Sequence, residues 1–514
     1  MKLGSRIQMP LAGFGRLRSL HWLLLLMLVS YGLRLALVHQ GGQMYKPDET
    51  RYRRAAGIAN QISAFKLADG LGNMLLYDHH PGAKAAFTLP ALLHRVAYAL
   101  QPGNEQSWDQ YWRDKHGDFR LSAVFLALPS VVSIGLVYQI ARRAGGDELE
   151  ALLAAFVLAA SNSWFISSRH LLPYDMSLCL ALTAWAVSLR RRTDNWTLGM
   201  MVGFLLCGAF LVYMNYWLLV GLIALLDCLT RAKCWRGMIL RLLQLTLGAA
   251  LLLWIYLAYN LAVAQINLPK ELSSFAQSVT HGSFDEGMVF PFRYFGDTEG
   301  IMSLVWAGGL LLAGWWIWRR RLPPRHRATR WIGCLLGLYG TLTLVSSGLQ
   351  VFVLYGRSVR ILLPFIALVC GWSFAAWLRQ RSYLLMALFV AATCAIALSN
   401  FTLVAGLRFP RDFERRVLAE YPDYATASIY TGQRTDDQAL ILPEDSARYL
   451  LINGSYLYPI TEQSERPPGR LLLEASHPIN YRPLQYEGMT PEMRDIVRRD
   501  PVMIWLIDTQ AKEN

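Results

Sequence analysis

Charged side chains are scarce in this chain. Asp, Glu, Lys and Arg make up 17% of its 514 residues, whereas hydrophobic residues make up 54%. The few charges gather between long apolar runs, which is unlike a soluble protein of two or three domains with polar surfaces. Because a run of about 18 apolar residues is long enough to cross a bilayer as a helix, the shortage of charge predicts a membrane protein.

Three further absences exclude other classes. No contiguous basic soluble segment exists, so the net charge of +14 does not indicate a nucleic-acid-binding protein. No internal repeat is evident. The segments that we predict to lie outside the cytoplasm hold no cysteine and imply no disulfide framework. The seven cysteines lie in apolar runs or in predicted cytoplasmic loops: Cys179, Cys207, Cys228, Cys234, Cys334, Cys370 and Cys394.

The first apolar run, His21 to Val38, follows a basic tail. It is too long for the core of a typical signal peptide, and no small-residue cleavage site follows it. We therefore interpret it as a retained first span. Further runs bring the predicted number of spans to about eleven: Leu121–Ile140, Ala151–Ile166, Met176–Leu189, Leu198–Val212, Trp217–Leu229, Ile239–Ala262, Ile301–Trp318, Trp331–Phe352, Ile361–Leu378 and Tyr383–Leu403.

Basic residues predict the orientation. Cytoplasmic loops of membrane proteins carry an excess of Lys and Arg, and here every second loop is basic. The tail from Ala405 onward has 13 Lys and Arg against 17 Asp and Glu, a net charge of −4, which fits the opposite side. We expect a multi-pass protein of the inner (cytoplasmic) membrane, with a cytoplasmic amino terminus and an extracytoplasmic tail. The basic loops hold Arg142–Arg143, Arg190–Arg192, Arg231–Arg236, Arg319–Arg330 and Arg379–Arg381.

The chain is expected to form two parts. Residues 1–404 would be an α-helical membrane module, whose first outside loop spans residues 39–120, and residues 405–514 a small soluble α/β domain. In the first loop, Thr50–Lys66 has the pattern of a helix lying on the membrane surface. Phe87–Leu100 is a further helical stretch, and the aromatic residues of Glu105–Asp118 suit an interfacial segment.

The tail shows strand and helix signals of its own. Ala439–Leu442, Leu471–Glu474 and Val502–Ile507 are short apolar strand candidates. Thr490–Arg499 is predicted to be a helix, because a Thr that can cap the first turn is followed directly by Pro. No motif in this tail indicates a particular chemistry.

Polar segments on the predicted outside face are the candidates for a functional site. The first is Lys46–Tyr52, in which Asp48 and Glu49 precede the surface helix. Carboxylates at this place stabilise the positive end of a helix dipole. One of them could equally serve as a general base at the membrane surface.

The second segment is Tyr77–Lys84. Its adjacent histidines, His79 and His80, lack the i, i+4 spacing of a strong zinc motif, and a polar turn before a helix explains them as well. A divalent metal is compatible with the sequence but is not indicated by it. Lys84 would either extend toward lipid headgroups or bind a phosphate.

The third and fourth segments border apolar runs. Asp175 opens one run, where an ionisable group is costly and by default suggests a functional role, unless it only caps the helix. Arg357 and Arg360 put two positive charges into an outside loop, against the trend. They suggest an anionic partner such as a lipid phosphate, with a headgroup anchor as the alternative. Asn215 and Tyr216, at another outside turn, are weaker candidates for substrate binding.

Taken in order, these segments resemble those of lipid-dependent glycosyltransferases with the membrane-embedded C-type fold. The nearest resemblance is to the protein O-mannosyltransferase family, including the bacterial aminoarabinose transferases of lipid A. The resemblance extends over residues 20–403, and the sequence departs from the family pattern at Gly82 and at Met214–Tyr216. The matching segments are Pro47–Tyr52, His80–Lys84, Arg169–Asp175 and Arg357–Pro364.

The resemblance implies an enzyme that transfers a sugar, with inversion, from a polyprenyl-phosphate-linked donor to a lipid, glycan or protein. Asp48 would deprotonate the acceptor hydroxyl, and cations would stabilise the departing phosphate. No glycine-rich nucleotide-binding motif is present, which disfavours a nucleotide-sugar donor. The implied residues are Asp48, Glu49 and Asp175 for catalysis; Lys84, Arg357 and Arg360 for the donor phosphate; and Arg51, Tyr52, His80, Arg169, Asn215 and Tyr216 for other substrate contacts.

Two other classes of protein were weighed. A transporter or flippase of a lipid-linked sugar predicts ionisable residues in the middle of spans and often inverted repeats, whereas the candidates here lie at one interface. A non-catalytic scaffold leaves the acidic pair and the arginine pair unexplained. The transferase hypothesis makes a geometric prediction, because it requires Asp48, Lys84, Asp175, Arg357 and Arg360 to converge.

Overall fold

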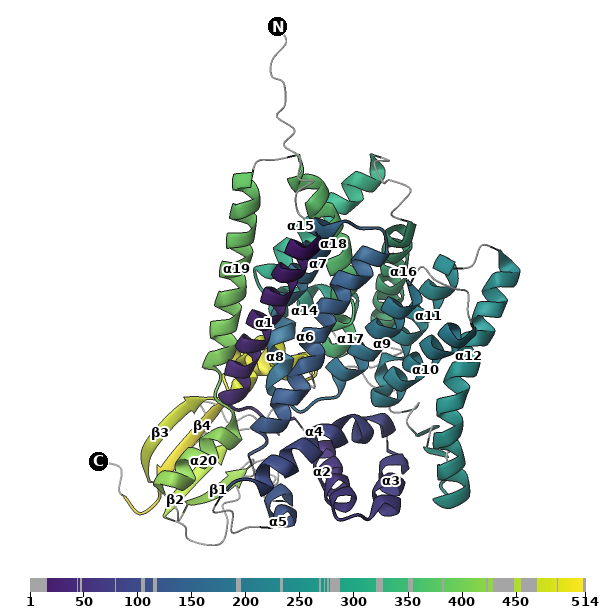
Figure 1. The fold of residues 1–514 in the computed structure, drawn as a ribbon. Helices are drawn as coiled ribbons and strands as arrows, with labels where there is room; N and C mark the ends of the chain where they lie inside the picture. The colour runs from purple at the N-terminus through teal and green to yellow at the C-terminus, as the bar shows by residue number, and fades with distance from the viewer. Residues whose placement is uncertain are drawn as a thin grey trace.

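A computed structural model gives the arrangement of most of the chain. It describes residues 16–43, 45–46, 49–78, 80–102, 107–113, 118–190, 196–231, 234–267, 270–271, 273–274, 277, 287–319, 327–349, 355–380, 383–421, 424–428, 448–453, 469–487 and 489–511. Within these residues the protein is a large helical bundle with a small sheet at one end (Figure 1). This confirms the predicted fold class. We call the two ends of the bundle the sheet end and the far end.

Helices occupy all of the predicted apolar runs. Six of them are long and apolar enough to cross a membrane, or seven if one bent pair is counted as a single span. The chain is thus a multi-pass membrane protein. The helices of the bundle are α1 (Arg16–His39), α6 (Arg120–Arg143), α7 (Glu148–Ala159), α8 (Asn162–Ile166), α9 (Tyr174–Ser188), α10 (Trp196–Val212), α11 (Trp217–Arg231), α12 (Trp235–Ala258), α15 (Met302–Trp318), α16 (Arg327–Leu349), α17 (Gly356–Arg360), α18 (Leu363–Leu378) and α19 (Tyr383–Gly406).

The predicted continuous span Ala151–Ile166 is wrong in one respect, because the structure bends it by 60° between α7 and α8. Glu299 explains the bend. Its carboxylate accepts hydrogen bonds from the backbone N–H groups of Asn162 (2.8 Å) and Ser163 (3.2 Å), so a side chain satisfies donors that a preceding helical turn would otherwise bind. After α8 the chain continues into a short 3-10 turn, η3 (Ser167–Arg169).

The first long loop folds into four helices beneath the bundle: α2 (Thr50–Ser63), α3 (Leu67–Leu75), α4 (Pro81–Ala99) and α5 (Trp108–Arg113) (Figure 1). The helix predicted at Thr50–Lys66 is confirmed as α2, and its place on the membrane surface stays a prediction. Helix α4 starts six residues earlier than predicted, with Pro81 in its first turn. Gly82 permits a close approach there, since a Cβ atom would lie 2.6 Å from the backbone N of Val212 at the end of α10.

The tail forms a four-stranded sheet in the order β1-β2-β4-β3, in which only β1 and β2 are parallel. The strands predicted near Leu471 and Val502 are confirmed, as is the helix that Thr490 caps by accepting a bond from the N–H of Met493. The predicted strand Ala439–Leu442 lies outside the described residues. The elements are α20 (Pro410–Glu420), β1 (Tyr424–Ser428), β2 (Tyr449–Asn453), β3 (Arg470–Ser476), η8 (Pro478–Asn480), α21 (Arg482–Gln485), α22 (Pro491–Arg499) and β4 (Met503–Asp508).

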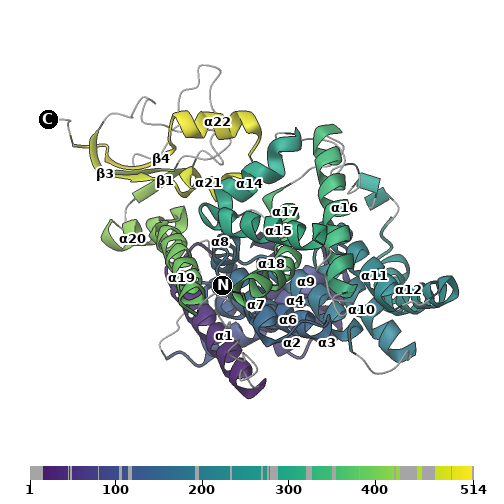
Figure 2. The same ribbon diagram turned by 90° about the horizontal axis from the view of Figure 1, so that it is seen from above.

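The tail packs directly on the bundle. Helices α21 and α22 lie beside α14 (Phe290–Glu299), as Figure 2 shows from above. The backbone N–H of Gly356, at the start of α17, donates to the carbonyl oxygen of Tyr486 (2.9 Å). The hydroxyl of Tyr486 and the guanidinium of Arg498 both bond the carboxylate of Asp297 (2.5 and 2.8 Å). These contacts fix the tail against the segment that carries Arg357 and Arg360.

Basic residues of the alternate loops meet at the far end. Arg142 pairs with Glu148 (2.7 Å), and Arg379 pairs with Glu150 (3.1 Å). Arg231 donates to the backbone carbonyl of Arg190 (2.9 Å). The described parts of the predicted cytoplasmic loops are therefore on one side of the bundle, opposite the sheet. The remaining short elements are η4 (Met214–Tyr216), η5 (Tyr259–Val263) and η6 (Gly287–Val289).

Candidate functional site

A buried ion pair lies at the centre of the candidate site. Asp175 is in the first turn of α9 and Arg360 ends α17, and their side chains form a short, direct hydrogen bond. Ser167 of η3 joins them, since its hydroxyl accepts from Arg360 (2.9 Å) and donates to Asp175 (3.0 Å). Asp175 and Arg360 are only 5% and 4% exposed. The structure thus brings together two predicted site residues that are 185 positions apart in the chain.

Two buried polar atoms in this region have no hydrogen-bond partner among the described residues, Nε of Arg360 and the hydroxyl of Tyr216. The side-chain carbonyl of Asn215, the residue before Tyr216, is a third such atom. The ring of Tyr216 stands 6.5 Å from that of Tyr174, the neighbour of Asp175. Buried polar groups are hydrogen-bonded in the great majority of cases, so these atoms leave bonds that a ligand or water can complete.

Arg357 lies against a set of tyrosines. Its guanidinium stands 3.9 Å from the ring centre of Tyr355 and 5.1 Å from that of Tyr174, and it donates a hydrogen bond to the Tyr174 hydroxyl (3.0 Å). Tyr213 adds a third ring at 5.7 Å. Aromatic faces attract a guanidinium and hold its plane in a fixed orientation. Arg357 is therefore positioned rigidly, as a bidentate anion-binding group requires.

The tail contributes a carboxylate that sequence reasoning missed. Glu487, which follows α21, pairs with Arg357 (3.2 Å) and approaches the ammonium group of Lys46 (4.0 Å). The prediction of this region rested on apolar strand patterns. A lone Glu in a polar turn carries no such signal, so only the tertiary structure could reveal its place.

Glu49 is completely buried and holds two segments together. Its carboxylate accepts from the N–H groups of Lys46 (2.9 Å) and Leu171 (2.7 Å), and it lies 3.2 Å from Nδ1 of His170. Burial lowers the pKa of His170 from its ordinary value, and the neighbouring Glu49 partly opposes that shift. Glu49 thus anchors the first-loop turn to the loop before α9. Its neighbour Asp48, the predicted base, lies outside the described residues.

Lys84 and Arg51 belong to a separate cluster under α3. The ammonium group of Lys84 donates to the carbonyl oxygens of Asn73 (3.0 Å) and Leu76 (2.6 Å), and burial lowers its pKa. Nε of Arg51 lies 3.9 Å from the carboxylate of Asp78. None of the contacts described for Lys84 reaches the arginines of α17. The structure therefore brings Asp175, Arg357 and Arg360 together, and the place of Lys84 in the same site stays a prediction.

The other predicted contacts serve as links between elements. Nδ1 of His80 accepts from the N–H of Met214 (3.2 Å), and its ring stands 4.5 Å from Tyr213, which connects α4 to the tyrosine set. Tyr52 is buried in the first-loop core and shares a short hydrogen bond with Ser122. Arg169 donates to four backbone carbonyls, those of Gln40, Gly41, Val404 and Leu407. The chemical roles of these residues stay predictions.

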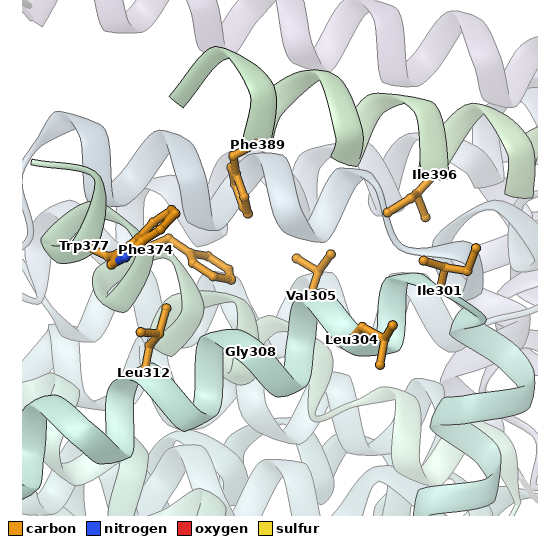
Figure 3. Close-up of a pocket in the computed structure, with 9 residues that line it drawn as sticks. All are labelled: Ile301, Leu304, Val305, Gly308, Leu312, Phe374, Trp377, Phe389 and Ile396. Atoms are coloured by element: carbon orange, nitrogen blue, oxygen red, sulfur yellow. The ribbon is translucent and has the colours of Figure 1, made fainter. Parts of the chain in front are cut away.

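An apolar cavity of about 310 Å³ lies elsewhere in the bundle, between α15, α18 and α19. Figure 3 shows its lining, with Ile301 and Ile396 toward one end and Leu312 and Trp377 toward the other. All of these lining residues are apolar. No cluster of three or more His, Cys, Asp or Glu side chains that could hold a metal ion occurs in the part of the chain that the structure describes.

No protein-family model and no curated protein matches the sequence. Solved structures do resemble the fold. ArnT from Cupriavidus metallidurans in the apo state has 16% identity and a TM-score of 0.48, with 77% of this chain and 68% of that chain covered. ArnT bound to undecaprenyl phosphate gives 14% identity and a TM-score of 0.48, with 78% and 73% covered.

The oligosaccharyltransferase of Archaeoglobus fulgidus is similar as well. Its identity is 13% and its TM-score 0.46, with 77% of this chain and 56% of that chain covered. These proteins are of the class that the sequence motifs resemble. At such identities and TM-scores the likeness decides nothing about chemistry, so the case for function depends on the residues of the site.

Proposed function

We propose that this protein transfers a sugar from a polyprenyl-phosphate-linked donor to a lipid, glycan or protein acceptor at the extracytoplasmic face of the inner membrane. The observation that carries the proposal is the arrangement around Asp175 and Arg360. Two arginines and a carboxylate are buried at one end of an apolar bundle, next to polar atoms without partners among the described residues. This is the arrangement expected of a site for an anionic, hydroxyl-rich ligand.

The distribution of charge supports the proposed side of the membrane. The basic loops meet at the far end, and loops rich in Lys and Arg stay in the cytoplasm. The candidate site and the sheet would then face away from the cytoplasm. A polyprenyl-linked donor suits that face, because its lipid anchor keeps the activated sugar at the membrane where no nucleotide sugar is supplied.

The two parts of the donor would bind in different environments. Its phosphate would bind Arg357 and Arg360, because a guanidinium matches a phosphate in charge and in bidentate geometry. Its isoprenoid chain would lie among the apolar helices. The cavity between α15 and α18 has the required lining for a hydrocarbon chain.

The reaction is a single displacement at the anomeric carbon. The acceptor oxygen attacks that carbon while its proton passes to Asp48, and the bond from the sugar to the phosphate oxygen breaks with inversion. The negative charge that develops on the polyprenyl phosphate would be stabilised by Arg357 and Arg360. Glu49, which is tied to Leu171, would hold the turn that carries Asp48 close to α9, and Asp175 would orient Arg360.

Mass spectrometry of envelope glycolipids and glycoproteins tests the proposal. Cells that express the chain should contain a glycosylated product that cells without it lack. Asp48→Asn should remove this product while the protein still inserts into the membrane, and Asp69→Asn, an exposed carboxylate in the same loop, should leave it unchanged. Normal product with Asp48→Asn would refute the proposed base. Loss with Asp175→Asn but not with Asp48→Asn would reassign that role.

A flippase, the alternative class, would move the donor across the membrane without forming a new glycosidic bond. Vesicles that contain only the purified chain, a polyprenyl-phosphate sugar and an acceptor separate the two classes. A transferase would form the glycosylated product there, whereas a flippase would only change the side of the membrane on which the donor is accessible.

A further inference from the structure

Glu487 ties the C-terminal tail to the proposed phosphate-binding residues. Its carboxylate lies 3.2 Å from the guanidinium of Arg357 and 4.0 Å from the ammonium group of Lys46. Arg357 comes from α17, Lys46 from the first-loop turn and Glu487 from the tail. One carboxylate thus neutralises two cations from two other parts of the molecule.

We propose that Glu487 is a substitute anion, which occupies the position of the donor phosphate at Arg357, with Lys46 as a further cation of that site, and gives it up when the phosphate binds. The inference rests on the proposed function and adds to it a residue that sets the affinity for the two forms of the lipid. The polyprenyl phosphodiester of the donor carries one negative charge. The monoester product carries about −1.5 to −2 at neutral pH, so both forms compete with the single charge of Glu487.

The surroundings of Glu487 allow its side chain to withdraw without moving the tail. The backbone carbonyl of Tyr486 accepts from Gly356 (2.9 Å), and the Tyr486 hydroxyl bonds Asp297 (2.5 Å). The Glu487 side chain itself is 16% exposed, so it has access to water on one side. In the proposed exchange, rotation about the side-chain bonds of Glu487 frees Arg357.

This arrangement has a direct effect on turnover. In the absence of Glu487, Arg357 and Lys46 would bind the monoester product more tightly than the donor, and release of product would become slow. A carboxylate that returns to Arg357 and Lys46 competes with the product for both cations. Glu487 would therefore weaken phosphate binding in the ground state and favour exchange of product for donor.

The test measures binding of undecaprenyl phosphate to the purified full-length protein in detergent. Glu487→Gln removes the competing charge and should tighten binding by about fivefold, the range of an ion pair at a partly exposed position. Glu487→Asp keeps the charge and should bind close to the wild-type affinity. Glu492→Gln, an exposed residue of α22, serves as the control for loss of a tail carboxylate.

The results separate the two proposals. Tighter binding by Glu487→Gln supports the substitute-anion role, since a misfolded variant would bind more weakly. Equal or weaker binding by the folded variant overturns that role and leaves the proposed function intact. If neither wild type nor variant binds undecaprenyl phosphate, both proposals fail together.

A second measurement uses the wild-type protein alone. Carbodiimide labelling of carboxylates, read out by mass spectrometry, should increase at Glu487 when undecaprenyl phosphate is added, because the carboxylate then loses Arg357 and becomes accessible. Labelling of Glu492 should not change. Unchanged labelling of Glu487 at saturating lipid would overturn the inference even if Glu487→Gln could not be purified.

Discussion

Among the residues that the structure describes, two buried acid–arginine pairs lie at opposite ends of the helices, and they differ in how many of their hydrogen bonds are made within the chain. At the far end, Asp227 of α11 accepts from Nε (2.6 Å) and Nη2 (3.2 Å) of Arg241 in α12, and Ser188 adds a short bond. Gln244 accepts from the remaining Nη1 of Arg241 (2.8 Å). Within the described residues, no side-chain nitrogen or oxygen of Asp227 or Arg241 is left buried without a partner.

The pair at the sheet end is arranged differently. Asp175 and Arg360 are equally well buried, yet Nε of Arg360 and the hydroxyl of nearby Tyr216 have no described partner. A buried ion pair pays for its desolvation only when its remaining hydrogen bonds are made. The far-end pair makes its own hydrogen bonds within the chain, which suits a structural role. At the sheet-end pair, Nε of Arg360 lacks a described partner, and in the proposed function a ligand would supply it.

Substitution of Arg360 should have the largest effect on activity. Arg360→Gln removes a charge that stabilises the departing phosphate, so we expect sugar transfer to fall by about 10²–10³-fold, as when a donor to a developing anion is removed. Purified variants assayed per mole of folded protein measure this effect. Arg408→Gln, an exposed arginine at the same end, should retain full activity. A similar loss in both variants would contradict the special role of the pair.

Breaking the far-end pair should instead affect stability. Asp227→Asn leaves Arg241 buried with a neutral partner, which typically costs about 3–5 kcal/mol. Thermal unfolding in detergent should shift down by several degrees, while the transfer rate per folded molecule stays near wild type. If Asp227→Asn unfolded normally but lost transfer, the assignment of the two pairs would have to be reversed.

Tyr216→Phe tests the difference between the two pairs by removing a single oxygen atom next to the sheet-end pair. The hydroxyl has no described partner, so its removal should leave the free energy of unfolding within about 0.5 kcal/mol of wild type. The transfer rate should fall about tenfold if this oxygen contacts the substrate. Tyr31→Phe, which loses a hydrogen bond to the carbonyl of Val124 (3.2 Å), is the converse control, with a slight loss of stability and normal transfer.

The smallest expected effect concerns pH. Burial holds the pKa of His170 below its ordinary value of about 6.5, whereas the unfolded chain binds a proton at that value. The unfolded state therefore gains the proton first, and His170 contributes stability that is lost as the pH falls below about 6.5. Melting temperatures between pH 7.5 and 5 should decline more steeply for wild type than for His170→Gln. Parallel curves would show that His170 does not contribute.

The sequence singled out three residues that the structure brings together, because each of them departs from the usual distribution of charge in a membrane protein. Asp175 is an acid that opens an apolar run, and Arg357 and Arg360 are cations on the predicted outside face. Both departures can be recognised from the sequence alone. The helices were equally predictable, because apolar runs of that length have few other stable structures in a bilayer.

The partners of these residues could not be predicted in the same way. Glu487 meets Arg357 across 130 positions, and Glu299 meets Asn162 across 137. A single carboxylate in a polar turn has many equivalent explanations in a sequence, and only the packing of distant elements selects one. The same holds for Lys84, which the motif order places with the arginines but whose described contacts are with the end of α3.

The bend between α7 and α8 has a consequence for biosynthesis. The first backbone N–H groups of α8 donate to the carboxylate of Glu299. The ribosome adds Glu299 to the chain 137 residues after Asn162. At about 5–20 residues per second this is a delay on the order of ten seconds. During that interval the donors of α8 must be met by water or by the translocation machinery. The segment leading to Asp175 can therefore reach its final form only after the second half of the bundle has begun to insert.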